Sequence, residues 1–312
     1  MSHAAQPAAR VCVTVPATAA NLGAGFDSLG LALGLFNMVE AALVGPKTRP
    51  EAVHTIEGEG AASLSCGPDN LVRRSMAAVA LRAGVDLPPV AVRQVNAIPL
   101  ARGLGSSSAA IVGGCVAANE LLGAPLSQDE LLAVAVQMEG HPDNVAPALL
   151  GGLTVCYAAE EGTGCLRLEP ADPPRAVVAI PDYEVETAKA RRALPDSVPR
   201  GDAVLNVGRA AATVAALVSG EHAALRSGME DRLHQPYRAH LVPGMDEAIA
   251  AALQAGALGA CLSGSGPTIL ALAHGPEDAV AEAMKQALAR LGVSAVTRVL
   301  DVCLQGATVT YP

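Results

Sequence analysis

The chain has 312 residues, of which 51% are hydrophobic but only 2% aromatic, so a large core must be built mainly from Ala, Val and Leu. Acidic residues outnumber basic ones by 30 to 21, and the formal net charge of −9 argues against a nucleic-acid binder, which needs a basic surface. A chain of this length is expected to form two domains.

Cysteine usage and the N-terminus favour a cytoplasmic protein that does not enter a membrane. The seven cysteines are scattered without a Cys-x-x-Cys pair, so we expect buried, reduced thiols rather than a disulfide framework or a zinc site. Residues 1–10 lack the apolar run of a signal peptide. Residues 248–273 carry no charge, but the Gly, Ser and Pro residues at 263–267 interrupt them, which favours a helix, a strand, a loop and a strand over a membrane span.

The first half of the chain is predicted to mix strands and helices. Strand-like patterns cover residues 11–15 (ended by Pro16), 29–40, 90–96 and 153–157. Helical patterns cover residues 70–83 and 108–122, and a capping box of Ser127 and Glu130 opens a third helix that runs to 139. Residues 141–144 are predicted to form a loop before a short helical turn at 145–150.

A segment rich in Gly, Pro and charge at residues 160–174 indicates the domain boundary, which gives domains of residues 1–160 and 161–312. The second half then alternates again. Strands are predicted at 176–180, 258–262, 269–273 and 294–302, and helices at 202–218, 247–255 and 277–291.

A glycine-rich loop at residues 99–110, PLARGLGSSSAA, is the strongest candidate for an anion site. Gly103 and Gly105 allow a tight turn, and the following helix would direct its free N–H groups at a triphosphate. The loop lacks the Gly-Lys-Ser/Thr of a Walker A motif, and Ser108 stands where a dinucleotide fingerprint has its third glycine. Taken alone, the string also fits a plain Gly/Ser loop with an ordinary helix cap.

Three segments in order resemble the superfamily of galactokinase, homoserine kinase, mevalonate kinase and phosphomevalonate kinase (the GHMP kinases). They are VPATAANLGAGFD at residues 15–27, the loop at 99–110, and LSGSGPT at 262–268. Within this superfamily the chain is most similar to the homoserine kinases, through NLGAGFD at 21–27, EGHPDNVAP at 139–147, PDNLV at 68–72 and DRLHQPYR at 231–238.

The resemblance implies an α+β, two-domain GHMP-kinase fold, with an N-terminal domain like domain 2 of ribosomal protein S5 and a ferredoxin-like C-terminal domain. It also implies transfer of phosphate from ATP to the side-chain hydroxyl of L-homoserine, with Mg²⁺ as cofactor, in threonine biosynthesis. ATP would lie against the glycine loop and homoserine in the cleft between the domains. A homodimer is expected from the family.

The resemblance assigns the nucleotide and cation contacts. ATP would be bound by Asn70, Pro99, Leu100, Ala101, Arg102, Gly103, Leu104, Gly105, Ser106, Ser107 and Ser108. Asn70 could equally be the N-cap of the helix that follows it. Ser107 and Glu139 would hold Mg²⁺, which prefers hard oxygen ligands.

Homoserine needs a carboxylate for its ammonium group, a cation for its carboxylate and polar contacts for its hydroxyl. By resemblance, Asp27 would bind the ammonium group and Arg191 and Arg238 the carboxylate, because a guanidinium can hold a carboxylate bidentately. The neutral polar contacts would come from Asn21, Thr187 and Asn144.

Catalysis is expected to rest on Asn144, Ser107 and Glu139. Asn144 takes the position where some relatives have a catalytic Asp, and Asn cannot act as a general base at neutral pH. We expect no dedicated base, with Asp143 not aimed at the hydroxyl, because phosphoryl transfer can depend on positioning and charge neutralisation. His141 is expected to orient neighbours by hydrogen bonding.

Three alternatives compete with this interpretation. A GHMP kinase for mevalonate, a galactose-like sugar or a diphosphocytidyl erythritol is disfavoured by residues 21–27 and Asn144. A non-catalytic ATP-binding relative should have lost Ser107 and Glu139. A Rossmann dehydrogenase is disfavoured by the late position of the loop and its missing glycine.

Overall fold

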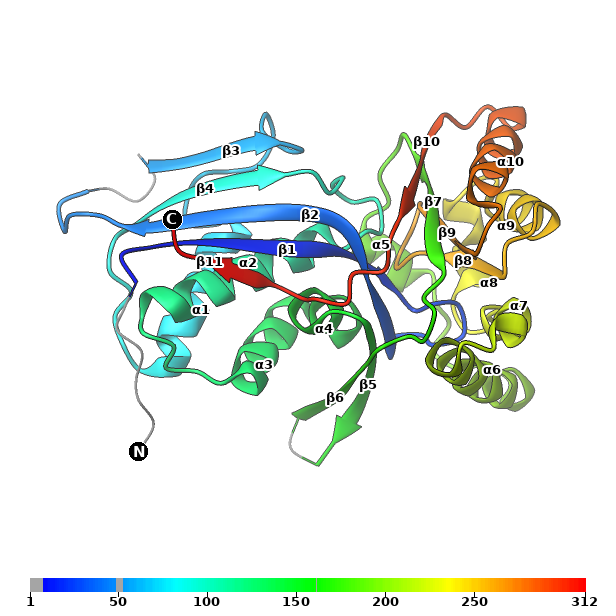
Figure 1. Ribbon diagram of the computed structural model, residues 1–312, viewed down its shortest axis with the longest axis horizontal. Helices are drawn as coiled ribbons and strands as arrows, with labels where there is room; N and C mark the ends of the chain where they lie inside the picture. The colour runs from blue at the N-terminus through cyan, green and yellow to red at the C-terminus, as the bar shows by residue number, and fades with distance from the viewer. Residues whose placement is uncertain (1–7, 49–52, 161) are drawn as a thin grey trace.

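The computed structural model describes residues 8–48, 53–160 and 162–312, and its strands form two sheets (Figure 1). Most of the N-terminal stretch predicted not to be a signal peptide lies outside the described residues. The seven-stranded sheet has the order β11-β1-β2-β4-β3 with a β5–β6 hairpin joined to β2, and the four-stranded sheet has the order β10-β7-β9-β8.

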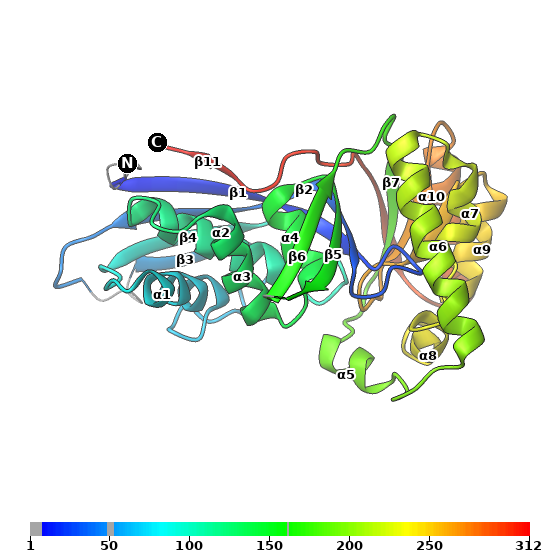
Figure 2. The same ribbon diagram turned by 90° about the horizontal axis from the view of Figure 1, so that it is seen from below.

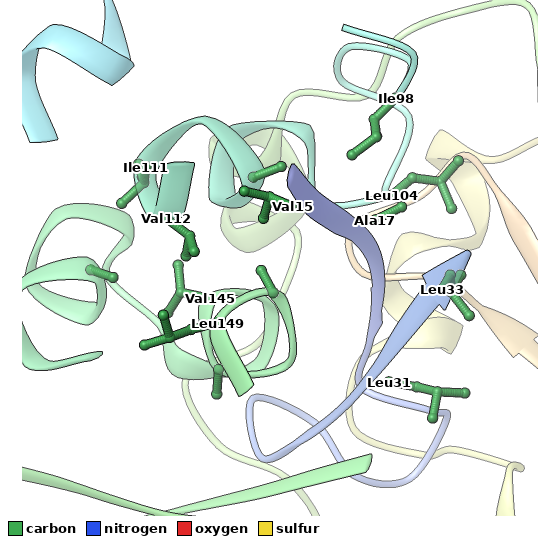
Figure 3. Packing of buried hydrophobic residues seen from close by; sticks show 14 of the residues in the cluster. Val15, Ala17, Leu31, Leu33, Ile98, Leu104, Ile111, Val112, Val145 and Leu149 are labelled. Atoms are coloured by element: carbon green, nitrogen blue, oxygen red, sulfur yellow. The ribbon is translucent and has the colours of Figure 1, made fainter. Parts of the chain in front are cut away.

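The seven-stranded sheet contains β1 (Arg10–Ala20), β2 (Leu29–Leu43), β3 (His54–Gly58), β4 (Val90–Asn96), β5 (Leu153–Ala159), β6 (Gly162–Leu168) and β11 (Thr308–Thr310). Four helices cover one of its faces (Figure 2): α1 (Leu71–Ala83), α2 (Ser106–Leu121), α3 (Gln128–Glu139) and α4 (Pro142–Leu150). Branched side chains of β1 and β2 meet those of α2 and α4 in the core between the layers (Figure 3).

The four-stranded sheet contains β7 (Arg175–Pro181), β8 (Gly259–Leu262), β9 (Ile269–Ala273) and β10 (Ala295–Leu300). The helices of the second half of the chain are α5 (Thr187–Arg192), α6 (Arg200–Ser219), α7 (Leu225–Gly228), α8 (Gln235–Arg238), α9 (Met245–Gln254) and α10 (Glu277–Arg290). The uncharged stretch at 248–273 therefore forms α9, β8 and β9, as predicted.

The predicted boundary at residue 160 is displaced from the point where the chain changes sheets. Strands β5 and β6 form one antiparallel hairpin of the first sheet, so the boundary falls inside it. The chain enters the second sheet only between Leu168 and Arg175, and β11 then returns to pair with β1. Gly and polar residues are typical both of the turn of the β5–β6 hairpin and of the connection to the second sheet. The composition of residues 160–174 therefore could not separate the two.

Local predictions at two prolines need correction. Strand β1 does not end at Pro16: its register to β2 shifts between Pro16 and Ala17, and pairing continues to Ala20. A bulge lets the strand accept a residue without an N–H group. Pro142 begins α4 with His141 as N-cap, where a loop was predicted, because proline suits the first turn of a helix.

Helix α6 is the one helix of the described residues that is long and apolar enough to cross a membrane by length and composition. Core helices of other proteins pass the same test. Only 22% of this apolar stretch of α6 is buried, and one face is joined to the rest of the protein by Asn206, whose buried amide donates to the Asp231 carboxylate and to the Ala24 carbonyl.

Candidate active site

A cleft of about 700 Å³ runs along the glycine loop, between it and the second half of the chain. The predicted site residues that line it are Asn21, Asp27, Asn70, Leu100, Ala101, Arg102, Gly103, Gly105, Ser106, Ser107, Glu139, Asn144, Thr187, Arg191 and Arg238. Predicted residues from six separate segments are thus brought together around one space. Three predicted residues, Pro99, Leu104 and Ser108, are not among its lining residues.

The glycine loop turns directly into the N-terminus of α2. Gly105 is the N-cap with φ +71° and provides no side-chain cap, so the first N–H groups of this 16-residue helix face the cleft without a side-chain acceptor. A Cβ on Gly105 would lie 1.9 Å from Thr18 Oγ1, so both the conformation and the space require glycine. The exposed N–H groups and the helix dipole make this end of α2 suited to an anion.

The tight turn at residues 263–267 holds the loop from the other side. The Ser263 hydroxyl donates to the Gly103 carbonyl at 2.7 Å, and the Thr268 N–H donates to the Arg102 carbonyl at 3.3 Å. Gly103 has φ +75° and a Cβ there would lie 2.3 Å from the Ser263 carbonyl oxygen. These contacts bring the second half of the chain against the loop.

Two hydroxyls and one carboxylate meet beside the start of α2. Ser107 and Ser108 both donate to Glu139 Oε1, at 2.7 and 2.9 Å. Ser107 is exposed and lines the cleft. Ser108 is fully buried, and its hydrogen bond reaches Glu139 from the protein interior. The C-terminus of α3 and the N-terminus of α2 therefore present a hydroxyl and a carboxylate oxygen to the same point.

The described residues contain no cluster of three or more His, Cys, Asp or Glu side chains able to hold a metal. A cation between Ser107 and Glu139 would need its remaining ligands from phosphate oxygens and water. That donor set fits Mg²⁺, which keeps several waters and usually takes one or two protein carboxylates along with substrate phosphates.

Helix α4 supplies a polar group and a buried carboxylate. Asn144 Oδ1 accepts a hydrogen bond from the Thr18 hydroxyl at 2.7 Å, which fixes the amide and leaves its NH₂ group as donor. Asp143 is 2% exposed and 2.7 Å from His141 Nδ1. Burial alone would lower the pKa of His141, but the Asp143 carboxylate raises it above its ordinary value. His141 thus has the orienting hydrogen bond that was predicted.

Asp27 and Arg191, predicted to bind opposite charges of one ligand, bind each other. Arg191 Nη1 and Nη2 donate to the two Asp27 oxygens at 2.9 and 2.7 Å, and this bond raises the pKa of Arg191. Asn21 holds the Asp27 loop: its Oδ1 accepts from the Asp27 N–H, and its amide donates to the Gly264 carbonyl. Acidic and basic groups therefore lie side by side at this end of the cleft.

Arg238 reaches the same end from within the protein. It is 2% exposed, donates to the carbonyls of Ala190 and Gly264, and lies with Cζ 5.4 Å from the Phe26 ring. Burial lowers the pKa of Arg238 to about 10, so the guanidinium stays charged at neutral pH. Thr187 lies at the cleft wall with its hydroxyl 3.3 Å from the Ser265 hydroxyl.

The opposite end of the cleft is polar and was largely missed from the sequence. Asn70 is the N-cap of α1, accepting from the Val72 N–H, and its amide donates to Gln94 Oε1 at 2.9 Å. The cleft lining also includes Asn37, Ser65, Asp69, Gln94 and Asn96. The available signal was in β4, where the buried positions change from Val90 and Val92 to Gln94 and Asn96.

Comparisons with known proteins identify the family of this chain. The model of the GHMP kinases N terminal domain matches residues 70–152, and that of the GHMP kinases C terminal matches residues 213–290. The chain is 46% identical over 297 residues to the homoserine kinase of Moorella thermoacetica, covering 95% of this chain and 99% of that protein. It is 48% identical over 265 residues to that of Thermus thermophilus, covering 85% and 87%.

The fold agrees as well. The crystal structure of homoserine kinase from Cytophaga hutchinsonii superposes with a TM-score of 0.86 at 31% sequence identity, covering 97% of this chain and 98% of that chain. The predicted two-domain α+β GHMP-kinase fold is confirmed. The chain belongs to the homoserine kinase family of the GHMP kinases.

Proposed function

We propose that this chain is an ATP-dependent kinase that phosphorylates the side-chain hydroxyl of L-homoserine, giving O-phospho-L-homoserine and ADP for threonine biosynthesis. One observation carries the proposal. A single cleft joins an uncapped helix N-terminus, suited to phosphates, to an adjacent Asp27–Arg191 pair, suited to a zwitterion.

ATP binds with its phosphates along the glycine loop and the first turn of α2. The N–H groups of Ser106 and Ser107 would donate to the phosphates, and the positive end of the helix dipole would stabilise their charge. The base then lies toward the polar end formed by Asn70 and Gln94. Because Asn70 is already the N-cap of α1, its role toward the nucleotide is to shape this wall.

Ser107 and Glu139 would hold Mg²⁺, with the remaining ligands coming from phosphate oxygens and water. When bound, the cation neutralises charge that develops on the phosphates during transfer. Glu139 is positioned for this by the buried Ser108 hydroxyl, which keeps one carboxylate oxygen in place.

Homoserine lies at the other end, with its charged groups at the Asp27–Arg191 pair. The ammonium group lies beside Asp27 and the carboxylate beside Arg191. The ion pair between the two side chains is thereby replaced by one ion pair from each side chain to the substrate. The buried Arg238 adds a fixed positive charge near the carboxylate. Asn21 and Thr187 complete the polar wall.

In the transfer step, the homoserine hydroxyl oxygen bonds to the γ-phosphorus and the bond from that phosphorus to the β–γ bridging oxygen breaks. The Asn144 NH₂ group, fixed through Thr18, positions the hydroxyl. The hydroxyl proton passes to a phosphate oxygen or to water, with no protein base, and the buried Asp143 carboxylate instead holds His141. Positioning and charge neutralisation supply the rate.

The decisive experiment is a coupled assay of ADP formation with purified protein, ATP and single acceptor alcohols. We expect ADP formation with L-homoserine and Mg²⁺, little with mevalonate or galactose, and none after chelation of the metal. Phosphohomoserine should appear in equal amount by mass spectrometry. Turnover of mevalonate or a sugar without turnover of homoserine would contradict the substrate, and absence of turnover with every acceptor would favour a non-catalytic relative.

We further propose a cytoplasmic homodimer, as expected from the family. Light scattering coupled to size-exclusion chromatography tests the dimer directly, since the chain mass is 31.3 kDa and a dimer has twice that value.

A further inference from the structure

The β5–β6 hairpin places two thiols face to face, although the sequence predicted unconnected cysteines. Cys156 and Cys165 are register partners in the antiparallel pair, and the Cys156 thiol donates a hydrogen bond to Cys165 Sγ at 3.6 Å. Cys156 is 2% exposed, whereas Cys165 is partly exposed. The two sulfurs are thus in contact, and Cys165 is the more accessible of the two residues.

The backbone shows that this is the pair type in which side chains lie closest. The Cys156 N–H donates to the Ser28 carbonyl at 2.7 Å, on the side of β2. The N–H and C=O groups of one strand residue point to the same edge, so those of Cys156 point away from β6. Cys156 and Cys165 therefore form a non-hydrogen-bonded pair, whose Cα atoms are typically about 4.5 Å apart. Disulfides span Cα separations of roughly 4.4–6.8 Å.

The shared hydrogen bond also differentiates the two sulfurs. The bond from the Cys156 thiol lowers the pKa of Cys165, and the same bond together with burial raises the pKa of Cys156. The thiolate, which is the reactive form, is therefore favoured on the more accessible sulfur.

We propose that Cys156 and Cys165 form a reversible dithiol–disulfide site that small-molecule disulfides can oxidise within the native fold. The Cys165 thiolate attacks one sulfur of the small disulfide, whose S–S bond breaks and releases one thiolate. The Cys156 thiol loses its proton to water, and its sulfur attacks Cys165 Sγ, which releases the second thiolate. Two protein thiols are oxidised by two electrons, and one small disulfide is reduced to two thiols.

The test treats the folded protein with oxidised glutathione and then counts thiols after denaturation. The wild type should fall from seven free thiols to five, with 156 and 165 joined in the peptide map, and dithiothreitol should restore seven. Cys156→Ser should stop at a glutathione adduct on Cys165. Cys303→Ser is the matched control, because Cys303 is another partly exposed thiol, and it should still lose two thiols.

Three results would overturn the proposal: an unchanged thiol count in the wild type, the loss of two thiols in Cys165→Ser, or a stable glutathione adduct in the wild type without the 156–165 bond. A fourth measurement checks the fit to the native hairpin. The Tm of the oxidised protein should equal or exceed that of the reduced protein, because an unstrained cross-link stabilises and a strained one does not. A lower Tm would refute closure within the native geometry.

Discussion

Replacing Arg191 by Met tests whether the Asp27–Arg191 pair serves binding or folding. Both side chains are about one-third exposed, at 34% and 35%, so the pair should contribute no more than about 1 kcal/mol to the free energy of unfolding. If the same two N–H groups hold the substrate carboxylate, the substitution removes charge-assisted hydrogen bonds to it. The expected loss of binding free energy is about 2–3 kcal/mol at this partly exposed position. The expected fall in kcat/KM for homoserine is therefore about 30- to 150-fold.

Steady-state kinetics with each substrate varied in turn measures the effect, and urea unfolding measures stability. The fall should come mostly from a higher KM for homoserine, with the KM for ATP within about twofold of the wild type. Arg192→Met is the matched control, because Arg192 is the exposed neighbour on the same helix. The reasoning is refuted if Arg191→Met and Arg192→Met have the same KM for homoserine, or if Arg191→Met loses several kcal/mol of stability.

Further predictions concern the phosphate end, the absent base and the buried histidine. Glu139→Gln should lower kcat by about 10²–10³ and raise the Mg²⁺ concentration needed for half-maximal rate, as a metal titration would show. Gly105→Ala should cost more than about 2 kcal/mol in urea unfolding and weaken ATP binding, since it adds backbone strain to a collision with Thr18; wild-type stability would contradict this. Asp143→Asn should keep kcat within about tenfold of the wild type if no base is used, and a loss as deep as that of Glu139→Gln would identify Asp143 as the base. Burial lowers the pKa of His234, so unfolding stability should fall below pH 6.5, by up to about 1.4 kcal/mol per pH unit; His234→Gln should flatten this slope in unfolding curves between pH 7 and 5.

The direction of the last effect follows from proton binding in the two states. The unfolded chain protonates His234 near pH 6.5, while the folded chain resists protonation to a lower pH because the ring is fully buried. Between these two pKa values the unfolded state binds more protons, so stability rises with pH through this window and is fully present above it.

The sequence alone was sufficient to predict structural features that depend on residues close together along the chain. The capping box of Ser127 and Glu130 is present with both reciprocal hydrogen bonds, and the glycine loop does lead into a helix N-terminus. Both depend on hydrogen bonds over three or four residues, so their residue types identify them. The start of α2 at Ser106 instead of Ser108 is a difference of one half-turn.

Features that join distant segments could not be predicted in the same way. The ion pair of Asp27 and Arg191 spans 164 positions, and the two residues were assigned to separate charges of a ligand because nothing local shows that they touch. Strand β11 is short and returns to β1 from the far end of the chain, which no pattern of three residues can indicate. Such contacts depend on the tertiary arrangement of segments far apart in the sequence, and strand pairing itself depends on many weak, context-dependent preferences.

The same long-range connections explain why the cleft has its shape. Thr18, on β1, donates its N–H to the Leu104 carbonyl of the glycine loop and its hydroxyl to Asn144 Oδ1 on α4. Two residues further along, the Ala20 carbonyl accepts from the Gly264 N–H of the second half. One end of β1 therefore fixes the phosphate loop, the hydroxyl-binding amide and the turn of the other domain relative to one another. A bulge at Pro16 that keeps β1 paired to Ala20 is thus part of the active-site architecture, since a strand ending at Pro16 would leave all three without a common support.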